Sequence, residues 1–340
     1  MHNKLTSLLL FSLFFAAGCA GTGSSQPDWV NGNSSLYLPS KYLSGKGQDG
    51  HQAVARDRAR ADLTKIFEVR IQEQSEDQVR SNSKTEAGKT RLQLESSTSR
   101  NISTHSDQII SGIQIAETWE DKANKQFHVL AVLERMKASA NLRDSINQLD
   151  EVTALAIRRA RQNNNLLPKI GLAHRALQAQ LEREVYAKQL KIVDYSGRGL
   201  DSPYNLATLA NDRDALLQRM SIYSKVDTDP LGGLDTMLKA AISAAGFTHV
   251  TDTKKAYILE AKLILNERKD AQGWYWQRGT LEISLIHASS QQVQGSQRWD
   301  IKESSQDQTI AKKRVNDTID KILKSQLRST IISFGTNDPS

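Results

Sequence analysis

The sequence has few residues of the kinds that form disulfides, and it lacks the motifs that bind metal ions or supply a catalytic nucleophile. Its 340 residues include one cysteine, which excludes an intrachain disulfide, a cysteine-rich zinc site and a CxxC redox motif. The seven histidines are scattered, and neither the HExxH motif of zinc proteases nor the GxSxG elbow of serine hydrolases occurs. We therefore expect no metal, no cofactor and no catalytic residues. Carboxylates are plentiful but scattered, so an envelope hydrolase with a glycosidase-type pair stays open as a lesser alternative.

The sequence also lacks apolar runs of the kind that make a polytopic membrane protein. Its 45 Lys and Arg against 38 Asp and Glu give a net charge of +7. The basic residues are not interleaved with aromatic ones, which argues against a nucleic-acid partner. A chain of this length predicts about two domains of roughly 150 residues each.

The N-terminus carries the most informative pattern. His2 and Lys4 precede an apolar run over residues 8–15, and the small residues 16–18 then lead directly to Cys19. A basic start, a short apolar core and small residues before the cut are typical of a signal peptide. Small residues before the one cysteine resemble a bacterial lipobox, so we expect an acylated Cys19 as the mature N-terminus. The alternative is an ordinary signal peptide with an incidental cysteine.

The residues after Cys19 favour localisation to the outer membrane. Ala20 stands where an aspartate would resemble an inner-membrane retention signal. Several acyl chains on one residue anchor firmly, at about 0.8 kcal/mol for each buried CH₂. The Gly- and Ser-rich residues 21–26 then form a short flexible tether. We expect the folded part to lie at the periplasmic face of the outer membrane.

Residues 27–137 read as an α+β unit. A helical stripe follows Ala55, Ala59, Leu63 and Phe67, and two alternating strands over residues 112–119 and 127–133 flank a turn. Between these strands and the helix lies the polar stretch 72–108, for which we favour some helix over full disorder.

Residues 45–50 spell a literal GxGxxG before a helix. A dinucleotide site would need a buried strand before it and a βαβ unit around it. Pro39 interrupts the preceding stretch, which leaves only Tyr42 and Leu43 as strand, and the elements that follow look antiparallel. We therefore interpret the motif as a tight turn whose glycines supply positive φ.

The rest of the chain predicts a helical hairpin and a second α+β unit. Two apolar stripes predict helices over residues 137–161 and from Pro168 onward. Residues 190–193 suggest a strand, and residues 231–245 a helix closed by Gly246. Three strands over residues 257–265, 274–286 and 293–301 then form a meander, and a helix over 309–332 ends the chain.

Trp274, Tyr275 and Trp276 form the strongest candidate for an exposed site. On a strand, Trp274 and Trp276 point one way and Tyr275 the other. Aromatic anchors are typical hot spots of protein interfaces. We expect one of the two tryptophans to be a partner-binding residue beside Lys269 and Arg278. The alternative is that the tryptophan pair packs under the terminal helix, as large aromatic side chains more often do.

Several of these motifs together resemble the LPP-twenty-like family of bacterial lipoproteins. They are Pro27-x-Trp29, Tyr42-Leu43-x-Gly45-x-Gly47, the helix 55–63, Gly112-Ile113-x-Ile115-x-x-x-Trp119 and the strand Leu130 to Arg135. The resemblance covers roughly residues 19–137. It implies an outer-membrane lipoprotein, tied in some members to envelope assembly, and it supplies no catalytic residues. The helix–meander–helix order of the second unit is also loosely similar to periplasmic activators of peptidoglycan synthases.

The sequence therefore predicts an α+β protein of two units, each with helices packed on an antiparallel sheet, joined by a helical hairpin. We expect a non-catalytic binding or assembly module whose partner is an envelope protein or the cell wall, with an accessory activator of peptidoglycan synthesis as the alternative. The oligomeric state stays open. The predicted segments are a signal peptide (1–18), a lipidated tether (19–26), the first unit (27–137), the hairpin (138–185), the second unit (186–335) and a tail (336–340).

Overall fold

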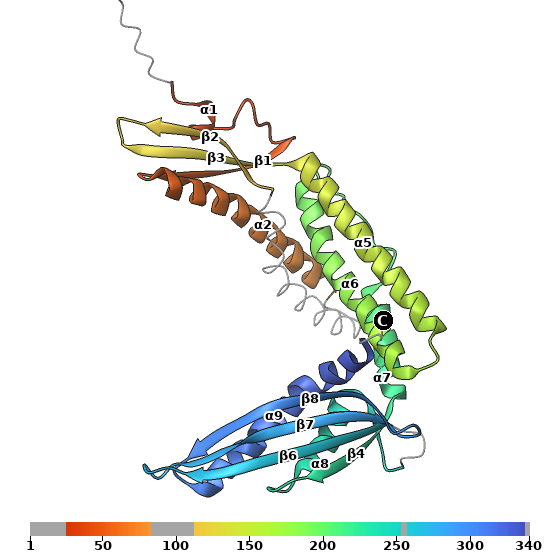
Figure 1. The fold of residues 1–340 in the computed structure, drawn as a ribbon. Coiled ribbons are helices and arrows are strands. Elements are labelled where there is room, and N and C mark those ends of the chain that lie inside the picture. The colour runs from red at the N-terminus through yellow and green to blue at the C-terminus, as the bar shows by residue number, and fades with distance from the viewer. Residues whose placement is uncertain (1–24, 83–111, 253–256, 337–340) are drawn as a thin grey trace, which may run out of the picture.

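The computed structural model describes residues 25–82, 112–252 and 257–336. Within these ranges two sheets with packed helices lie at opposite ends of a helical hairpin (Figure 1). The predicted α+β class is thereby confirmed. Much of the polar stretch 72–108 lies outside the described residues, and so does Cys19. Among the helices in the described ranges, none combines the length and apolar character that a membrane crossing requires.

The first unit is a three-stranded antiparallel sheet in the order β1–β3–β2. Helix α2 covers one face, and Trp29 of the short helix α1 packs with Leu130 and Val132 on the other. The predicted stripe is confirmed, because Ala55, Ala59, Leu63 and Phe67 are all buried in this core. The elements are α1 (Asp28–Asn31), β1 (Tyr42–Asp49), α2 (Gln52–Asn82), β2 (Gln114–Asp121) and β3 (Gln126–Glu134).

The GxGxxG stretch is a strand, which corrects its interpretation as a tight turn. β1 runs through Gly45 and Gly47, and neither glycine has a positive φ. Both face α2, where a Cβ on Gly45 would lie 2.5 Å from the backbone nitrogen of Leu63. These glycines therefore let a helix backbone approach a strand closely. The antiparallel pairing of β1 with β3 also lacks the βαβ unit of a dinucleotide site.

The predicted helical hairpin is confirmed as α5 (Arg135–Gln162) and α6 (Leu166–Val193). Leu142, Ile146 and Ala156 are buried as expected, whereas Leu155, placed in the same stripe, is 42% exposed. The strand predicted over residues 190–193 is wrong, because these residues form the last turn of α6. They are apolar since this end of α6 is buried in the core of the first unit.

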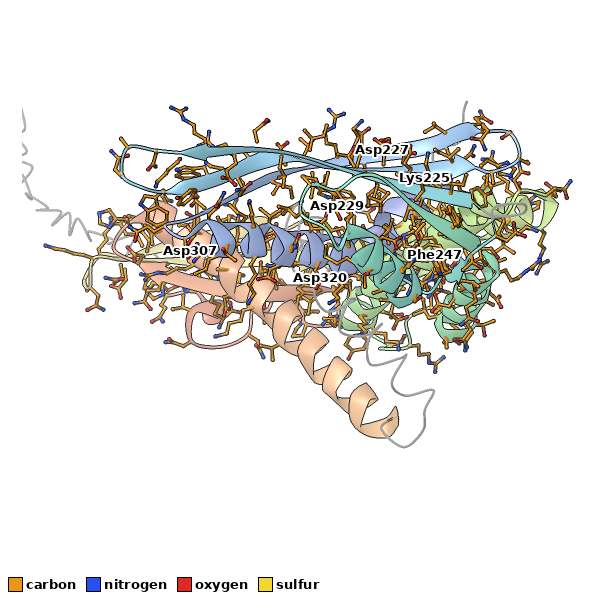
Figure 2. All side chains as sticks on the ribbon, turned by 90° about the horizontal axis from the view of Figure 1, so that it is seen from below. Lys225, Asp227, Asp229, Phe247, Asp307 and Asp320 are labelled. Atoms are coloured by element: carbon orange, nitrogen blue, oxygen red, sulfur yellow. The ribbon has the colours of Figure 1, made fainter. Side chains whose placement is uncertain are left out.

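The second unit is a five-stranded sheet in the order β5–β4–β6–β7–β8. Helices α8 and α9 pack on one face and close the largest core of the protein (Figures 1 and 2). Asp320 on α9 marks the helical side in Figure 2. The elements are α7 (Leu206–Arg219), β4 (Ser221–Thr228), α8 (Leu234–Ala244), β5 (Thr248–Val250), β6 (Tyr257–Lys269), β7 (Tyr275–His287), β8 (Gln292–Ser305) and α9 (Gln308–Thr336).

This second sheet is mixed, which corrects the prediction of an antiparallel one. The meander β6–β7–β8 is antiparallel as expected, but β4 pairs in parallel with both β5 and β6. Helix α8 supplies the crossover that a parallel neighbour needs. The predicted helix end at Gly246 is confirmed, since that residue has φ of 89° directly after the C-cap Ala245.

Candidate functional site

The five-stranded sheet has a face that α8 and α9 do not cover. Along β7, Leu281, Ile283 and Leu285 are buried under the helices. The intervening residues of β7 point to the opposite side, which we call the outer face. They are Trp276, Arg278, Thr280, Glu282, Ser284 and Ile286, and each of them is partly or fully exposed.

Trp276 lies at the end of this outer face, where the β6–β7 turn closes the hairpin. Its indole Nε1–H donates to Oδ2 of Asp270 at 2.9 Å. Two cations flank the ring, with the guanidinium carbon of Arg278 5.0 Å and the ammonium of Lys302 5.8 Å from the ring centroid. The indole is thus fixed in place by one carboxylate and two cation–π contacts, with part of its surface open to solvent.

Trp274 precedes β7 rather than lying on it, so the expectation that both tryptophans belong to one strand holds only for Trp276. Its side chain is 37% exposed. Its backbone N–H donates to Oδ1 of Asp270 at 2.8 Å, so the same carboxylate holds both tryptophans. Neither tryptophan belongs to the core under the terminal helix. The alternative of a buried pair is therefore wrong.

Asp270 is the residue that organises this turn. The indole N–H of Trp276, followed by the backbone N–H of Trp274, lowers the pKa of its carboxyl below the ordinary value. Both donors stabilise the charged form of the carboxylate. Asp270 therefore stays ionised at neutral pH and keeps both tryptophans in position.

Of the two cations that the sequence predicted beside the tryptophans, one contacts Trp276 and the other contacts Tyr275. Arg278 lies against Trp276 as expected, whereas Lys269 lies over the ring of Tyr275, at 4.7 Å from its centroid. Lys302 comes from β8 and was missed. The register of the β7–β8 hairpin, which pairs Arg278 with Lys302, is the signal that locates it. We call Trp274, Tyr275, Trp276, Lys269, Arg278 and Lys302 together the aromatic end of the sheet.

Charge distinguishes the aromatic end from the rest of the outer face. Farther along the outer face, Lys225 pairs with Glu260 at 2.6 Å and Arg298 pairs with Glu282 at 2.7 Å. Within the described ranges Arg278 and Lys302 form no ion pair with a carboxylate. The aromatic end therefore presents aromatic rings beside two cations, Arg278 and Lys302, whose charges are not engaged in ion pairs with the described residues.

One constellation that sequence reasoning missed brings a serine, a histidine and an aspartate together. The Ser224 hydroxyl donates to Asp235 at 3.1 Å and lies 3.3 Å from Nε2 of His249. In a catalytic triad the aspartate orients the histidine, and the histidine accepts the serine proton. Here the carboxylate of Asp235 accepts the hydroxyl's hydrogen bond directly, and its pKa is lowered mainly by Lys239. The arrangement therefore does not activate the hydroxyl, which is itself buried.

A metal centre finds no support in the described part of the chain. No three histidine, cysteine, aspartate or glutamate side chains gather there closely enough to hold an ion.

Comparisons with known proteins find similar solved structures, and one family model that matches part of the chain. Among solved structures, the secreted protein HP1454 from Helicobacter pylori is 15% identical over 84% of this chain and 97% of its own, with a TM-score of 0.43. A minor lipoprotein from Acinetobacter baumannii is 16% identical over 34% of this chain and 91% of its own, with a TM-score of 0.24. No curated protein matches the chain. The model of the LPP20 lipoprotein family matches residues 27–134, the same part of the chain that carries the motifs of Trp29, Gly45 and Gly47.

Proposed function

We propose that the protein is an outer-membrane lipoprotein, anchored through Cys19, that serves as a non-catalytic binding module of the cell envelope. The LPP20 lipoprotein match over residues 27–134 supports the anchored state. The contact surface of the module is the aromatic end of the second sheet. The observation that carries this assignment is the position of Trp276 on the helix-free face between Arg278 and Lys302.

The geometry of the chain suits such a role. The first unit stands next to the lipidated end, and α5 has 28 residues, which corresponds to about 42 Å of helix. The hairpin therefore separates the aromatic end from the first unit by a distance comparable to a small domain. The aromatic end can thus contact a periplasmic partner protein while Cys19 stays anchored in the membrane.

The chemistry of the surface selects the partner class. Large rings supply apolar contact area, and the cations beside them favour a carboxylate-bearing surface. We therefore propose an envelope protein with an acidic, partly apolar patch as the partner.

The test is capture of the partner by crosslinking in intact envelopes, with variants of the aromatic end. Replacing a hot-spot tryptophan by alanine costs about 2 kcal/mol or more of binding, which is about thirtyfold in affinity. We expect Trp276→Ala to lose capture by about that factor with the melting temperature nearly unchanged. Val293→Ala is the matched control, because Val293 is an exposed apolar residue of β8 outside the aromatic end.

Three outcomes separate the proposal from its rivals. Unchanged capture in both Trp274→Ala and Trp276→Ala removes the aromatic end as the site. Capture of a peptidoglycan synthase whose rate rises with this protein identifies the module as an accessory activator. Mass spectrometry of the mature N-terminal peptide tests the anchor, since an unmodified Cys19 contradicts it.

A further inference from the structure

A groove between the hairpin and α7 lies far along the chain from the aromatic end. This open groove has a volume of about 860 Å³ and is lined by α5, α6, α7 and the loop that precedes α7. Small side chains make the room, because Ala154, Ala173 and Ala176 face a space that larger residues would fill. Ile157, Leu209 and Leu216 complete the apolar wall. The groove therefore offers a concave, largely apolar surface on the outside of the helices.

Three cations stand around this apolar wall. Arg158 and Arg161 come from the last turns of α5, and Lys169 comes from the first turn of α6. Arg161 and Lys169 flank the hairpin loop, so positive charge gathers at that end of the groove. None of the three makes an ion pair inside the described ranges, and Asp212 is the one carboxylate of the lining.

This combination is typical of a site for a small amphiphile. Ligand pockets enclose roughly 300–1,000 Å³, with mostly apolar walls and a few convergent polar groups. The apolar wall of α5 from Ala154 to Arg161 extends over about 11 Å at 1.5 Å per residue. An alkyl chain lies along such a wall, while a carboxylate or phosphate at its end meets guanidinium and ammonium groups.

We propose that this groove binds a single-chain anionic lipid. The acyl chain lies on the alanine-lined wall between α5, α6 and α7. The head group is held at the hairpin-loop end by Arg161 and Lys169, with Arg158 beside the chain. The site is independent of the aromatic end.

The proposal is tested on the full chain in envelopes with a diazirine-bearing myristate, followed by mass spectrometry of the labelled peptides. We expect labelling to concentrate on peptides of α5, α6 and α7 around the groove. The double variant Arg158→Glu with Arg161→Glu should lower this labelling at least tenfold. Arg175→Glu on the exposed side of α6 is the matched control and should leave it unchanged.

Two further probes make the outcome decisive. Ala173→Phe fills the groove without changing charge and should also abolish labelling, while Trp276→Ala should not affect it. A neutral probe, the monoacylglycerol of the same diazirine chain, should label at least tenfold less. The proposal is overturned by equal labelling with the neutral probe, by labelling spread over other elements, or by an acidic helical peptide that occupies the groove where myristate does not.

Discussion

At the scale of single residues, Gly45 and Gly47 determine how closely helix α2 approaches strand β1. A Cβ on Gly45 would lie 2.6 Å from the carbonyl oxygen of Ala59, and one on Gly47 would overlap the backbone of Ala55 and Ala59. Backbone atoms cannot rotate away as a side chain does. The packing of this unit therefore depends on two positions without side chains.

We expect Gly47→Val to lower the free energy of unfolding by about 3 kcal/mol, because the added atoms force the helix away from the sheet. Urea denaturation followed by circular dichroism measures this change. Gly50→Val is the control, since the nearest atom to a Cβ there is 3.8 Å away. Equal stability of the two variants would contradict the close strand–helix contact.

Asp270 gives a residue-scale prediction about pH. Its pKa is lowered in the folded state, chiefly by the indole of Trp276, so its contribution to stability is fully present above the unfolded value of about 3.9. That contribution is lost as the pH falls through the lowered pKa. We expect the Nε1–H resonance of Trp276 to shift over this acidic range, and Asp270→Asn to abolish the titration.

Trp299 is the internal reference for that experiment. Its indole donates to the amide oxygen of Gln326 at 2.7 Å, and an amide does not titrate. The Trp299 resonance should therefore stay constant while that of Trp276 moves. A Trp276 resonance that also stays constant would show that Asp270 does not hold the ring in solution.

The sequence predicted the position of a site residue correctly where that position depends on neighbours along the same strand. Neighbouring positions along the chain placed Arg278 beside the tryptophans, and it does lie against Trp276. Lys302 reaches the same ring from a neighbouring strand, so its position depends on hairpin register. Gly45 and Gly47 were recognised as special, but the sequence alone did not reveal that a helix backbone, rather than a turn, requires them.

At the scale of elements, the α5–α6 hairpin is held together by a buried polar cluster. Arg183 is 1% exposed and donates to Asp150 on α5 at 2.9 Å. It also donates to the carbonyl oxygens of Leu200 and Asp201 in the loop before α7. One guanidinium therefore joins two helices and a loop that are far apart in the sequence.

We expect Arg183→Met to destabilise the protein by about 3 kcal/mol, because Asp150 would keep the amide of Gln180 but be left partly buried without a cation. Arg143→Met is the matched control. Arg143 pairs with Asp194 at 3.1 Å, but its side chain is 41% exposed, so its loss should cost about 1 kcal/mol or less. Denaturation midpoints of the two variants that coincide would contradict this difference.

The errors of sequence reasoning about β4 and residues 190–193 have different physical causes. β4 pairs in parallel with its neighbours, and such pairing joins segments that a crossover helix separates. Residues 190–193 were mistaken for a strand because a short apolar run is ambiguous between a buried strand and a buried helix. The long helices and the meander had sustained periodicity, which is why they were predicted correctly.

At the scale of the whole molecule, the hairpin is joined to the second unit where α6 crosses α9. Gly171 and Gly335 lie at this crossing, and a Cβ on either one would overlap the backbone of the other helix. Leu167 and Ile170 of α6 are buried in the core of the second unit, whereas the other end of α6 is buried in the first. One helix therefore links the two cores (Figure 1).

The α6–α9 crossing holds the two units in their relative positions. We expect Gly171→Val to push α9 away from α6, because neither backbone can yield locally. The radius of gyration from small-angle X-ray scattering should rise, and thermal unfolding should separate into two transitions as the cores lose their shared helix. Arg175→Val places the same β-branched residue on the exposed side of α6 and should change neither quantity. If Gly171→Val keeps the wild-type scattering curve and a single transition, the relative placement of the two units does not rest on this contact.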